Sequence, residues 1–440
     1  PGRATIESFR EGRNPYDPAL YAHPPFHFTL YPPLYFLLVA ALPPHSGNPF
    51  HTGRVVALAS MVLACAAVVL LLRKARLLWL APLAFGVFFL LRPVLVHAAY
   101  VKCDSLALLL SALAVVLLGE GAPTSGRVAA SALLAFLSTA TKHSYVASAA
   151  AGFLHLLLVR RKGAFLFAGI YGGGVAVGSL LAILAWGKGF GFCLVDALRQ
   201  PFSWRAFAFA TEPVVREPVL GALLLLTAAG IALRGGATSR RTPYFPYLVG
   251  STGVLLLTAP KFGSWTNYLF EFSLACVLFL VARVRALERP AGAGVLASVL
   301  LLGASACAET LLSKPGTFSS LSPEYETALR SERERLARDL RPGGSRILNL
   351  HSARYTYLLP EPAAVNDPFL YLLLWRAGTL DAAPLHRALR EHAFDRVLVP
   401  RTAGPPPRPL RDAWEEAADI LFREYPRRTP GPLFDVLSTR

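Results

Sequence analysis

The chain has 440 residues, of which 54% are hydrophobic and only 16% are charged. Soluble domains carry roughly 25% charged residues, and a soluble fold cannot hide so much apolar surface. Lys and Arg (44) outnumber Asp and Glu (27), but they gather in short clusters rather than along one continuous basic face, which argues against nucleic-acid binding. We therefore predict an integral membrane protein.

The first segment, residues 1–25, is polar and begins without a methionine, so we expect the chain to start inside a loop with upstream sequence missing. The apolar run that follows, residues 28–43, is about 16 residues long, shorter than the roughly 20 that a spanning helix needs. We predict that this run is a juxtamembrane helix. Residues 1–54 as a whole would then form an outer-face loop that includes this helix.

The next region, residues 55–312, is predicted to be a transmembrane module of about ten helices. Basic residues recur in every second loop, as at Arg73, Lys74 and Arg160, whereas the alternate loops hold fewer. Because cytoplasmic loops carry the Lys and Arg excess, this pattern places both ends of the chain on the outer side. The expected helices cover residues 55–72, 77–97, 104–118, 128–142, 144–159, 164–186, 213–234, 244–260, 266–283 and 292–312.

The last region, residues 313–440, alternates charged amphipathic stretches with short β-like runs. Helical patterns cover residues 324–340, 368–377, 382–392 and 408–424, and strand patterns cover residues 346–350, 363–365, 396–399 and 434–437. This alternation predicts a small soluble α/β domain on the outer side. The expected fold class is therefore an α-helical polytopic membrane protein with a small C-terminal soluble α/β domain.

Several charged residues lie at the outer ends of the predicted helices, although a charge deep in a bilayer costs about 2.5 to 3.5 kcal/mol. Asp104 begins one helix, Lys142 lies between two short helices, and Glu271 falls one turn inside an apolar run. Each has an ordinary explanation: Asp104 can cap its helix, a lysine can extend to the headgroups, and Glu271 can pair with Lys261. Because the predicted topology puts them on one side, we expect them to surround one cavity.

A set of short motifs follows one another in a recognisable order: Gly12-Arg-Asn-Pro-Tyr16, Tyr31-Pro-Pro-Leu-Tyr35, Gly53-Arg54, Lys102-Cys-Asp104, Thr141-Lys142 and Lys261-Phe-Gly-Ser-Trp-Thr-Asn267-Tyr268. This order resembles that of bacterial relatives of the dolichyl-phosphate-mannose protein mannosyltransferases. Those proteins are polytopic glycosyltransferases of the GT-C fold. The resemblance runs through nearly the whole chain.

The resemblance implies transfer of a hexosyl or pentosyl group from a polyprenyl-phosphate carrier to a lipid, glycan or protein acceptor on the outer face. Such a reaction needs a carboxylate that accepts the proton of the acceptor hydroxyl and cations that stabilise the departing phosphate. Asp104 matches the second acid of the family. The first acid would lie at or before Pro1, so Glu7 and Asp17 are substitute candidates for the catalytic base.

The resemblance also implies which other residues contact the substrate. The expected set is Tyr16, Tyr31, Arg54, Lys102, Lys142, Lys261, Asn267, Tyr268 and Glu271. No residue is assigned as a metal ligand, but carboxylates beside a phosphate can recruit Mg²⁺ or Mn²⁺. The expected partners are the lipid-linked donor, the acceptor and membrane lipids of a bacterial inner membrane, without nucleic acid.

A transporter or lipid flippase is the alternative function, because such proteins use intramembrane charges along a translocation path. Transporters usually show internal repeats and helices that are broken at the middle of the bilayer. The sequence shows no repeat, and its polar residues lie at helix ends. The glycosyltransferase therefore remains the leading hypothesis.

Overall fold

The computed structural model of the protein describes residues 2–24, 26–44, 49–74, 76–81, 101–119, 121–196, 199–200, 202–216, 218–232, 242–261, 266–286, 323–339, 346–350, 364–365, 367–400, 408–431 and 434–439. By its contacts the chain divides into two compact units. The helical unit comprises Tyr31–Leu181 and Gln200–Ser313. The mixed unit joins three separate segments, Pro1–Leu30, Ala182–Arg199 and Lys314–Arg440.

The helical unit is built from apolar helices that follow the predicted runs closely. The run expected at 104–118 is helix α7 (Asp104–Leu118), and the other described runs agree within several residues. The run expected at 292–312 and most of 77–97 lie outside the described residues. The remaining elements are α3 (Leu34–Ala41), α4 (Pro49–Lys74), η2 (Leu78–Leu80), α8 (Ser125–Thr141), α9 (Ala147–Val159), α10 (Arg161–Trp186), α12 (Trp204–Arg216), α13 (Pro218–Ala232), α14 (Tyr244–Thr258), η5 (Thr266–Tyr268) and α15 (Leu269–Ala286).

The helices observed at 213–234 and at 28–43 differ from the apolar runs there. The single helix expected at 213–234 is wrong, because the structure has two helices there, α12 and α13. Proline fixes its own backbone and lacks an N–H, so Pro218 begins a new helix rather than continuing α12. The run at 28–43 contains only the eight-residue helix α3. At 1.5 Å per residue this helix is too short to cross a bilayer.

Large apolar side chains cover the outside of the helical unit. Leu225 is 75% exposed, Phe165 is 72% exposed and Leu158 is 71% exposed. Among the described residues, two helices are long and apolar enough to cross a membrane, His51–Lys74 and Arg161–Trp186. Large exposed apolar side chains in such number are unfavourable in water and suited to lipid tails. The helical unit therefore has the surface of a membrane protein.

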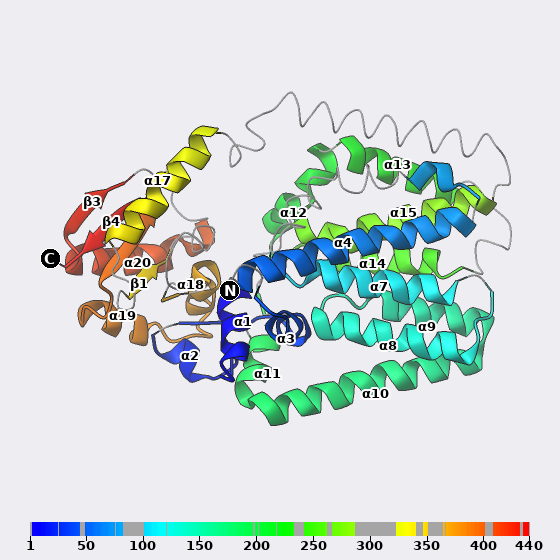
Figure 1. Ribbon diagram of the computed structural model, residues 1–440, viewed down its shortest axis with the longest axis horizontal. Helices are drawn as coiled ribbons and strands as arrows, with labels where there is room; N and C mark the ends of the chain where they lie inside the picture. Colours follow the sequence, from blue (N-terminus) through cyan, green and yellow to red (C-terminus); the bar gives the residue numbers. More distant parts are fainter. Residues whose placement is uncertain are drawn as a thin grey trace. The chain divides into compact units, whose positions relative to one another are not determined.

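Helix α7 lies at the centre of the helical unit, in contact with α4, α8 and α9, while α14 packs on α9 and α15 (Figure 1). Small hydroxyl side chains let α7 and α8 approach closely, since Ser131 and Ser138 donate hydrogen bonds to backbone oxygens of α7 at 2.7 Å. At the other end of α7, the Arg127 guanidinium donates to its last carbonyl groups at 2.8 and 3.0 Å. These contacts fix α7, which carries Asp104 at its first position.

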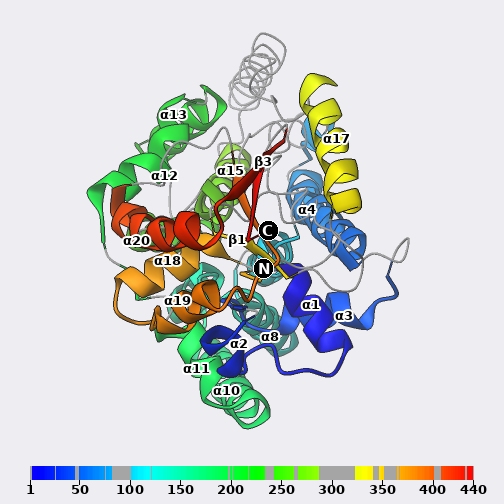
Figure 2. The ribbon, with the colours of Figure 1, turned by 90° about the vertical axis from the view of Figure 1, so that its left-hand side faces the viewer.

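The mixed unit contains a four-stranded sheet with the order β1-β2-β4-β3. Strand β1 (Ile347–Asn349) pairs parallel to β2 (Arg396–Pro400), and β4 (Phe434–Ser438) pairs antiparallel to β2 and to β3 (Arg427–Pro430). Helices α18 (Pro368–Arg376), α19 (Ala383–Arg390) and α20 (Arg408–Glu424) lie on one side and α17 (Pro323–Asp339) on the other (Figure 2). The described residues of the C-terminal region thus combine helices with a small sheet, as predicted.

Two parts of the mixed unit differ from the strands predicted from the sequence. Strand β3 was missed because all four of its residues are exposed, so it lacks alternating apolar positions. Of the strand expected at 363–365, residue 363 lies outside the described residues, and Val365 forms an isolated bridge with Phe26. Its partner lies in the N-terminal segment, more than 300 residues away, which no local pattern reveals.

The N-terminal segment packs as part of the mixed unit. It contains α1 (Gly2–Arg10) and α2 (Ala19–Ala22), and it contacts α11 (Lys188–Leu194). The Tyr16 ring is fully buried against Phe9, Trp186 and Phe190, with ring centroids 5.1 to 6.5 Å apart. The expected outer-face segment 1–54 thus divides between the two units at Leu30.

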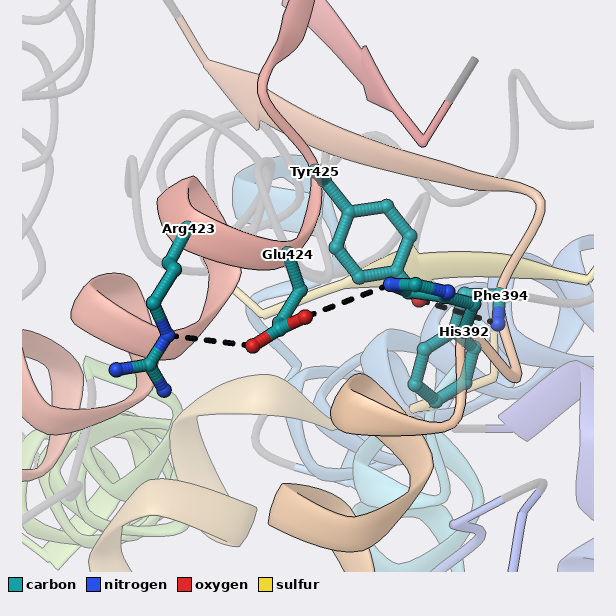
Figure 3. Close-up of polar contacts among 5 residues, drawn as sticks. All are labelled: His392, Phe394, Arg423, Glu424 and Tyr425. Atoms are coloured by element: carbon teal, nitrogen blue, oxygen red, sulfur yellow. Dashed lines mark hydrogen bonds and ion pairs between the residues drawn. The ribbon is translucent and has the colours of Figure 1, made fainter.

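Polar contacts at one corner of the mixed unit hold the loop after α19 against the end of α20 (Figure 3). His392 has a left-handed backbone with φ 52°, and its Nε2 lies 3.5 Å from Glu424 Oε2. Arg423 Nε donates to the other carboxylate oxygen at 3.2 Å. The buried Phe394 N–H donates to the Tyr425 hydroxyl at 3.4 Å. These contacts join neighbouring elements, so we assign them a structural role.

Candidate active site

The Asp104 side chain lies at the centre of a buried polar cluster in the helical unit. Its Oδ1 accepts hydrogen bonds from Lys142 Nζ at 2.5 Å and from Asn267 Nδ2 at 2.8 Å. Both members of the ion pair are only 1% exposed. Asp104 Oδ2 has no hydrogen-bond partner among the described residues. Asp104 therefore does not act as a helix cap, and one of its oxygens remains available.

The Lys142 ammonium is enclosed by three tyrosine rings. Its Nζ lies 4.7 Å from the ring centroid of Tyr268, 5.5 Å from that of Tyr145 and 5.8 Å from that of Tyr31. Aromatic faces attract cations, most strongly where water is excluded. Burial favours the neutral amine, but the Asp104 carboxylate outweighs that effect and raises the pKa of Lys142. The ammonium therefore stays charged and is held in one place.

Local backbone structure explains how Lys142 reaches this position. Helix α8 ends at Thr141, and Lys142 follows in an extended conformation. The Lys142 carbonyl then accepts the Tyr145 N–H at 2.9 Å, which closes a turn before α9 begins. This turn, residues 142–146, directs Lys142 back toward the start of α7.

The Gly53-Arg54 motif contributes close packing rather than charge to the cluster. A Cβ atom on Gly53 would lie 2.6 Å from Val101, whose chain neighbour is Lys102. The Tyr35 hydroxyl also donates to the Gly53 carbonyl at 2.9 Å. Arg54 itself is exposed. Glycine at position 53 thus lets α4 approach the segment that leads into Asp104.

Glu271 belongs to a second polar cluster in the helical unit. Its Oε1 accepts from the Ser111 hydroxyl at 2.6 Å and from the Tyr247 hydroxyl at 3.3 Å. Within the described part of the chain, no ion pair joins Glu271 to Lys261, so the alternative explanation of Glu271 as the partner of Lys261 has no support there. Ser111 lies two turns after Asp104 on α7, and Glu271 lies one turn after Asn267. The two clusters together fasten α7 to the start of α15.

Two more candidate lysines lie within electrostatic range of the first cluster. The Lys102 ammonium interacts with the Asp104 carboxylate, and the Lys261 ammonium acts on the imidazole of His143. Both lysine side chains are half-buried. The structure therefore gathers these predicted site residues around one end of the helical unit: Tyr31, Lys102, Asp104, Lys142, Lys261, Asn267 and Tyr268.

The remaining predicted residues lie in the mixed unit and have local contacts there. Glu7 pairs with Arg3 at 2.7 Å along α1. The Asp17 carboxylate accepts the Ala19 N–H at 2.9 Å at the start of α2. Tyr16 is buried in the aromatic cluster already described. Their role as catalytic or substrate contacts stays a prediction.

Sequence reasoning missed three residues of these clusters. Tyr145 is a close neighbour of Lys142 in the chain, so a turn after α8 would have suggested it. Ser111 shares a helix face with Asp104, seven residues earlier, and this spacing was available in the sequence. Tyr247 gave no local indication, because only the packing of α14 on α15 brings its hydroxyl to Glu271.

Comparisons with known proteins show a similarity of fold but no match in sequence. No protein-family model and no curated protein matches the sequence. Two solved structures of ArnT from Cupriavidus metallidurans match 100% of this chain and 92% of theirs, at 11% sequence identity. The apo structure gives a TM-score of 0.58, and the structure bound to undecaprenyl phosphate gives 0.56. ArnT is a GT-C glycosyltransferase. This chain has the GT-C fold.

The fold comparison confirms one part of the sequence resemblance and leaves another unsupported. The predicted GT-C fold is confirmed over the full length of the chain. The closer resemblance to protein mannosyltransferases is not confirmed. At 11% identity the likeness establishes the shared architecture, so the chemistry must be argued from the residues of this chain.

His143 gives the site a testable dependence on pH. Burial and the nearby Lys142 and Lys261 ammonium groups lower the pKa of His143 to about 4, although Asp104 acts in the opposite direction. The unfolded chain binds this proton near pH 6.5, so folding stability is complete above pH 6.5 and falls as the pH drops toward 4. In thermal unfolding of the full chain, we expect His143→Asn to reduce the loss of Tm between pH 7 and pH 4.5. Equal losses in the two proteins would contradict this assignment.

Proposed function

We propose that the protein transfers a sugar from a polyprenyl-phosphate-linked donor to a lipid, glycan or protein acceptor. The observation that carries this proposal is the full-length similarity of fold to a GT-C glycosyltransferase, one structure of which is bound to undecaprenyl phosphate. The buried charge cluster around Asp104 lies in the helical unit that this fold provides. The similarity favours a glycosyltransferase over the transporter or flippase alternative.

The finer features of the reaction are part of the same proposal. The transferred group is a hexosyl or pentosyl unit, and the reaction takes place on the outer face of a bacterial inner membrane. The basic residues in alternate loops support this orientation, since cytoplasmic loops carry more Lys and Arg. The exposed apolar surface of the helical unit supports a multi-pass location and contact with the prenyl tail.

The proposed chemistry is a displacement at the anomeric carbon. The acceptor oxygen forms a bond to this carbon as the carbon–oxygen bond to the phosphate breaks, and the bonding electrons leave on the phosphate oxygen. The acceptor proton passes to a carboxylate, for which Asp104 Oδ2 is the available atom in the described cluster. Lys142 and Asn267 hold the other oxygen, so they fix the direction of Oδ2. Nearby lysines stabilise the charge of the phosphate.

That the protein recruits a divalent cation, Mg²⁺ or Mn²⁺, is part of the proposal. Among the described residues, no three or more His, Cys, Asp or Glu side chains are grouped so as to hold a metal ion. The described cluster offers one available carboxylate oxygen, Asp104 Oδ2. Because Mg²⁺ requires an octahedral set of oxygen ligands, these residues do not form a metal site by themselves. No step of the proposed reaction depends on a metal here.

Replacing Asp104 with asparagine tests the proposed reaction. The full protein in membranes is assayed with labelled polyprenyl-phosphate sugars and a panel of lipid, glycan and protein acceptors. We expect Asp104→Asn to lower the rate of transfer by about 10² to 10⁴-fold, since an amide cannot take the proton. Unchanged transfer would remove Asp104 from the mechanism, and no transfer by the wild-type protein with any donor would contradict the function itself.

Two further variants separate chemistry from folding. Asp419→Asn, an exposed site on α20, makes the same chemical change away from the cluster and is expected to retain transfer. The double variant Asp104→Asn/Lys142→Met removes both charges and so avoids an unpaired buried ammonium. If the double variant unfolds at the wild-type temperature but transfers no sugar, the loss is chemical. Recovery of transfer in the double variant would instead assign Asp104 a structural role.

A further inference from the structure

The turn between α8 and α9 carries two polar groups that lack partners. His143 Nδ1 and Ser144 Oγ are both buried, and neither has a hydrogen-bond partner among the described residues. Buried polar atoms in folded proteins nearly always have a partner, and an exception commonly marks the place of a ligand or ordered water. Both residues as a whole are only partly buried, so a bound group can reach them.

The surroundings of this turn are positive. The Lys142 and Lys261 ammonium groups both act on the His143 imidazole, and Lys102 acts on the nearby Asp104. Asp104 is the carboxylate within range of His143, and it is already paired with Lys142. The Lys261 ammonium thus adds positive charge beside His143, which favours an anion.

His143 is held in a form and orientation that suit an anion. Its ring stacks on Tyr31, with centroids 6.5 Å apart and planes at 21°, which limits rotation of the imidazole. The low pKa of His143 keeps the ring neutral at neutral pH, and a neutral imidazole offers one N–H donor. The Ser144 hydroxyl next to it in the chain offers a second donor. Two neutral donors beside a lysine form a typical recognition set for phosphate oxygens.

We infer that His143 and Ser144, together with Lys261, bind the phosphate group of the lipid carrier. This inference rests on the proposed function; the sequence motifs had assigned Lys261 to the substrate, but not His143 or Ser144. Lys142 is not part of this subsite, because its ammonium is committed to Asp104 inside the tyrosine enclosure. The division leaves Lys142 to position Asp104 and gives the phosphate its own donors at the next two residues of the chain.

Binding of a carrier without a sugar tests the subsite directly. The full chain is placed in nanodiscs of zwitterionic phosphatidylcholine and titrated with undecaprenyl phosphate, and the Kd is measured. We expect His143→Phe, which keeps the stack on Tyr31 but loses the donor, to raise the Kd by about tenfold or more. Ser144→Ala is expected to raise the Kd several-fold. His143→Asn places an amide N–H near the position of Nδ1 and is expected to restore most of the binding.

A matched control and two other ligands make the test specific. Ser148→Ala removes a hydroxyl that is also without a partner among the described residues, but at a fully buried position within α9, and its Kd should remain that of the wild-type protein. Inorganic phosphate should compete with the carrier, whereas phosphatidylglycerol in the nanodisc should not. Equal Kd values for wild type, His143→Phe and Ser144→Ala would overturn the inference. Competition by phosphatidylglycerol would assign the site to bulk lipid headgroups and would also overturn it.

The outcomes also separate the subsite from the proposed function. Loss of undecaprenyl phosphate binding in His143→Phe, with no sugar transfer by the wild-type protein, would support the subsite and contradict the glycosyltransferase. Transfer by the wild-type protein together with unchanged binding in His143→Phe would support the glycosyltransferase and overturn the subsite.

Discussion

Lys142→Met is expected to destabilise the helical unit by about 3 to 5 kcal/mol, because it leaves the buried Asp104 carboxylate without its cation. Methionine fills much of the space of the lysine chain, so the loss comes from charge rather than from a cavity. The Asp104 Oδ1 would retain only the Asn267 amide as a donor. Denaturant unfolding of the full chain in detergent, followed by intrinsic fluorescence, measures the change.

Two controls identify the charge as the cause. Lys188→Met changes an exposed lysine on α11, and we expect it to alter stability by less than about 0.5 kcal/mol. Asp104→Asn/Lys142→Met should recover most of the loss, since a buried ion pair can be replaced by neutral groups at little cost. A double variant as unstable as Lys142→Met alone would show that lost packing around the tyrosine rings, and not the unpaired carboxylate, controls stability here.

Gly189→Ala is expected to destabilise the mixed unit by about 3 kcal/mol or more, at the upper end of the range for overpacking. A Cβ atom at position 189 would overlap the Tyr16 carbonyl oxygen and lie 3.0 Å from Pro18 Cδ. Because the obstructing atom belongs to the backbone, rotation of a side chain cannot relieve the overlap. Hydrogen exchange should increase in residues 14–18 and in α11, together with a lower Tm.

Gly191→Ala is the matched control on the same short helix. A Cβ atom at position 191 meets nothing within 4 Å. Alanine favours a helix over glycine by about 1 kcal/mol, so this variant is expected to be neutral or slightly stabilising. If both alanine variants unfold at the wild-type temperature, the close contact between α11 and the Tyr16 backbone does not contribute to stability.

Local patterns in the sequence were sufficient for most individual elements. Helix α7 was predicted at its observed bounds, because Asp104 starts an unbroken apolar run and Gly119 follows it with a positive φ. The same holds for the amphipathic helices of the C-terminal region, such as α20. Where prolines interrupt an apolar run, as at Pro218, hydropathy alone predicted one helix and the backbone formed two.

The candidate site was predicted as a set of residues on one side of the membrane, without the contacts between them. Asp104, Lys142 and Asn267 were named from short motifs, but the sequence did not show that one carboxylate oxygen accepts hydrogen bonds from both other residues. These pairs are separated by 38 and 163 residues. The contact between the Tyr145 ring and the Lys142 ammonium also depends on this packing.

The sequence by itself determined that the protein is a membrane protein, most of its described helices and which residue types can carry its chemistry. It could do so because hydropathy, proline positions and charge act locally along the chain. Only the tertiary structure decided which charges are paired, which polar atoms remain available and which distant segments share one unit. The pairing of Asp104 with Lys142 and the packing of Tyr16 against Gly189 both arise from close contacts between segments far apart in sequence. Such contacts follow from the packing of whole helices, so no local pattern specifies them.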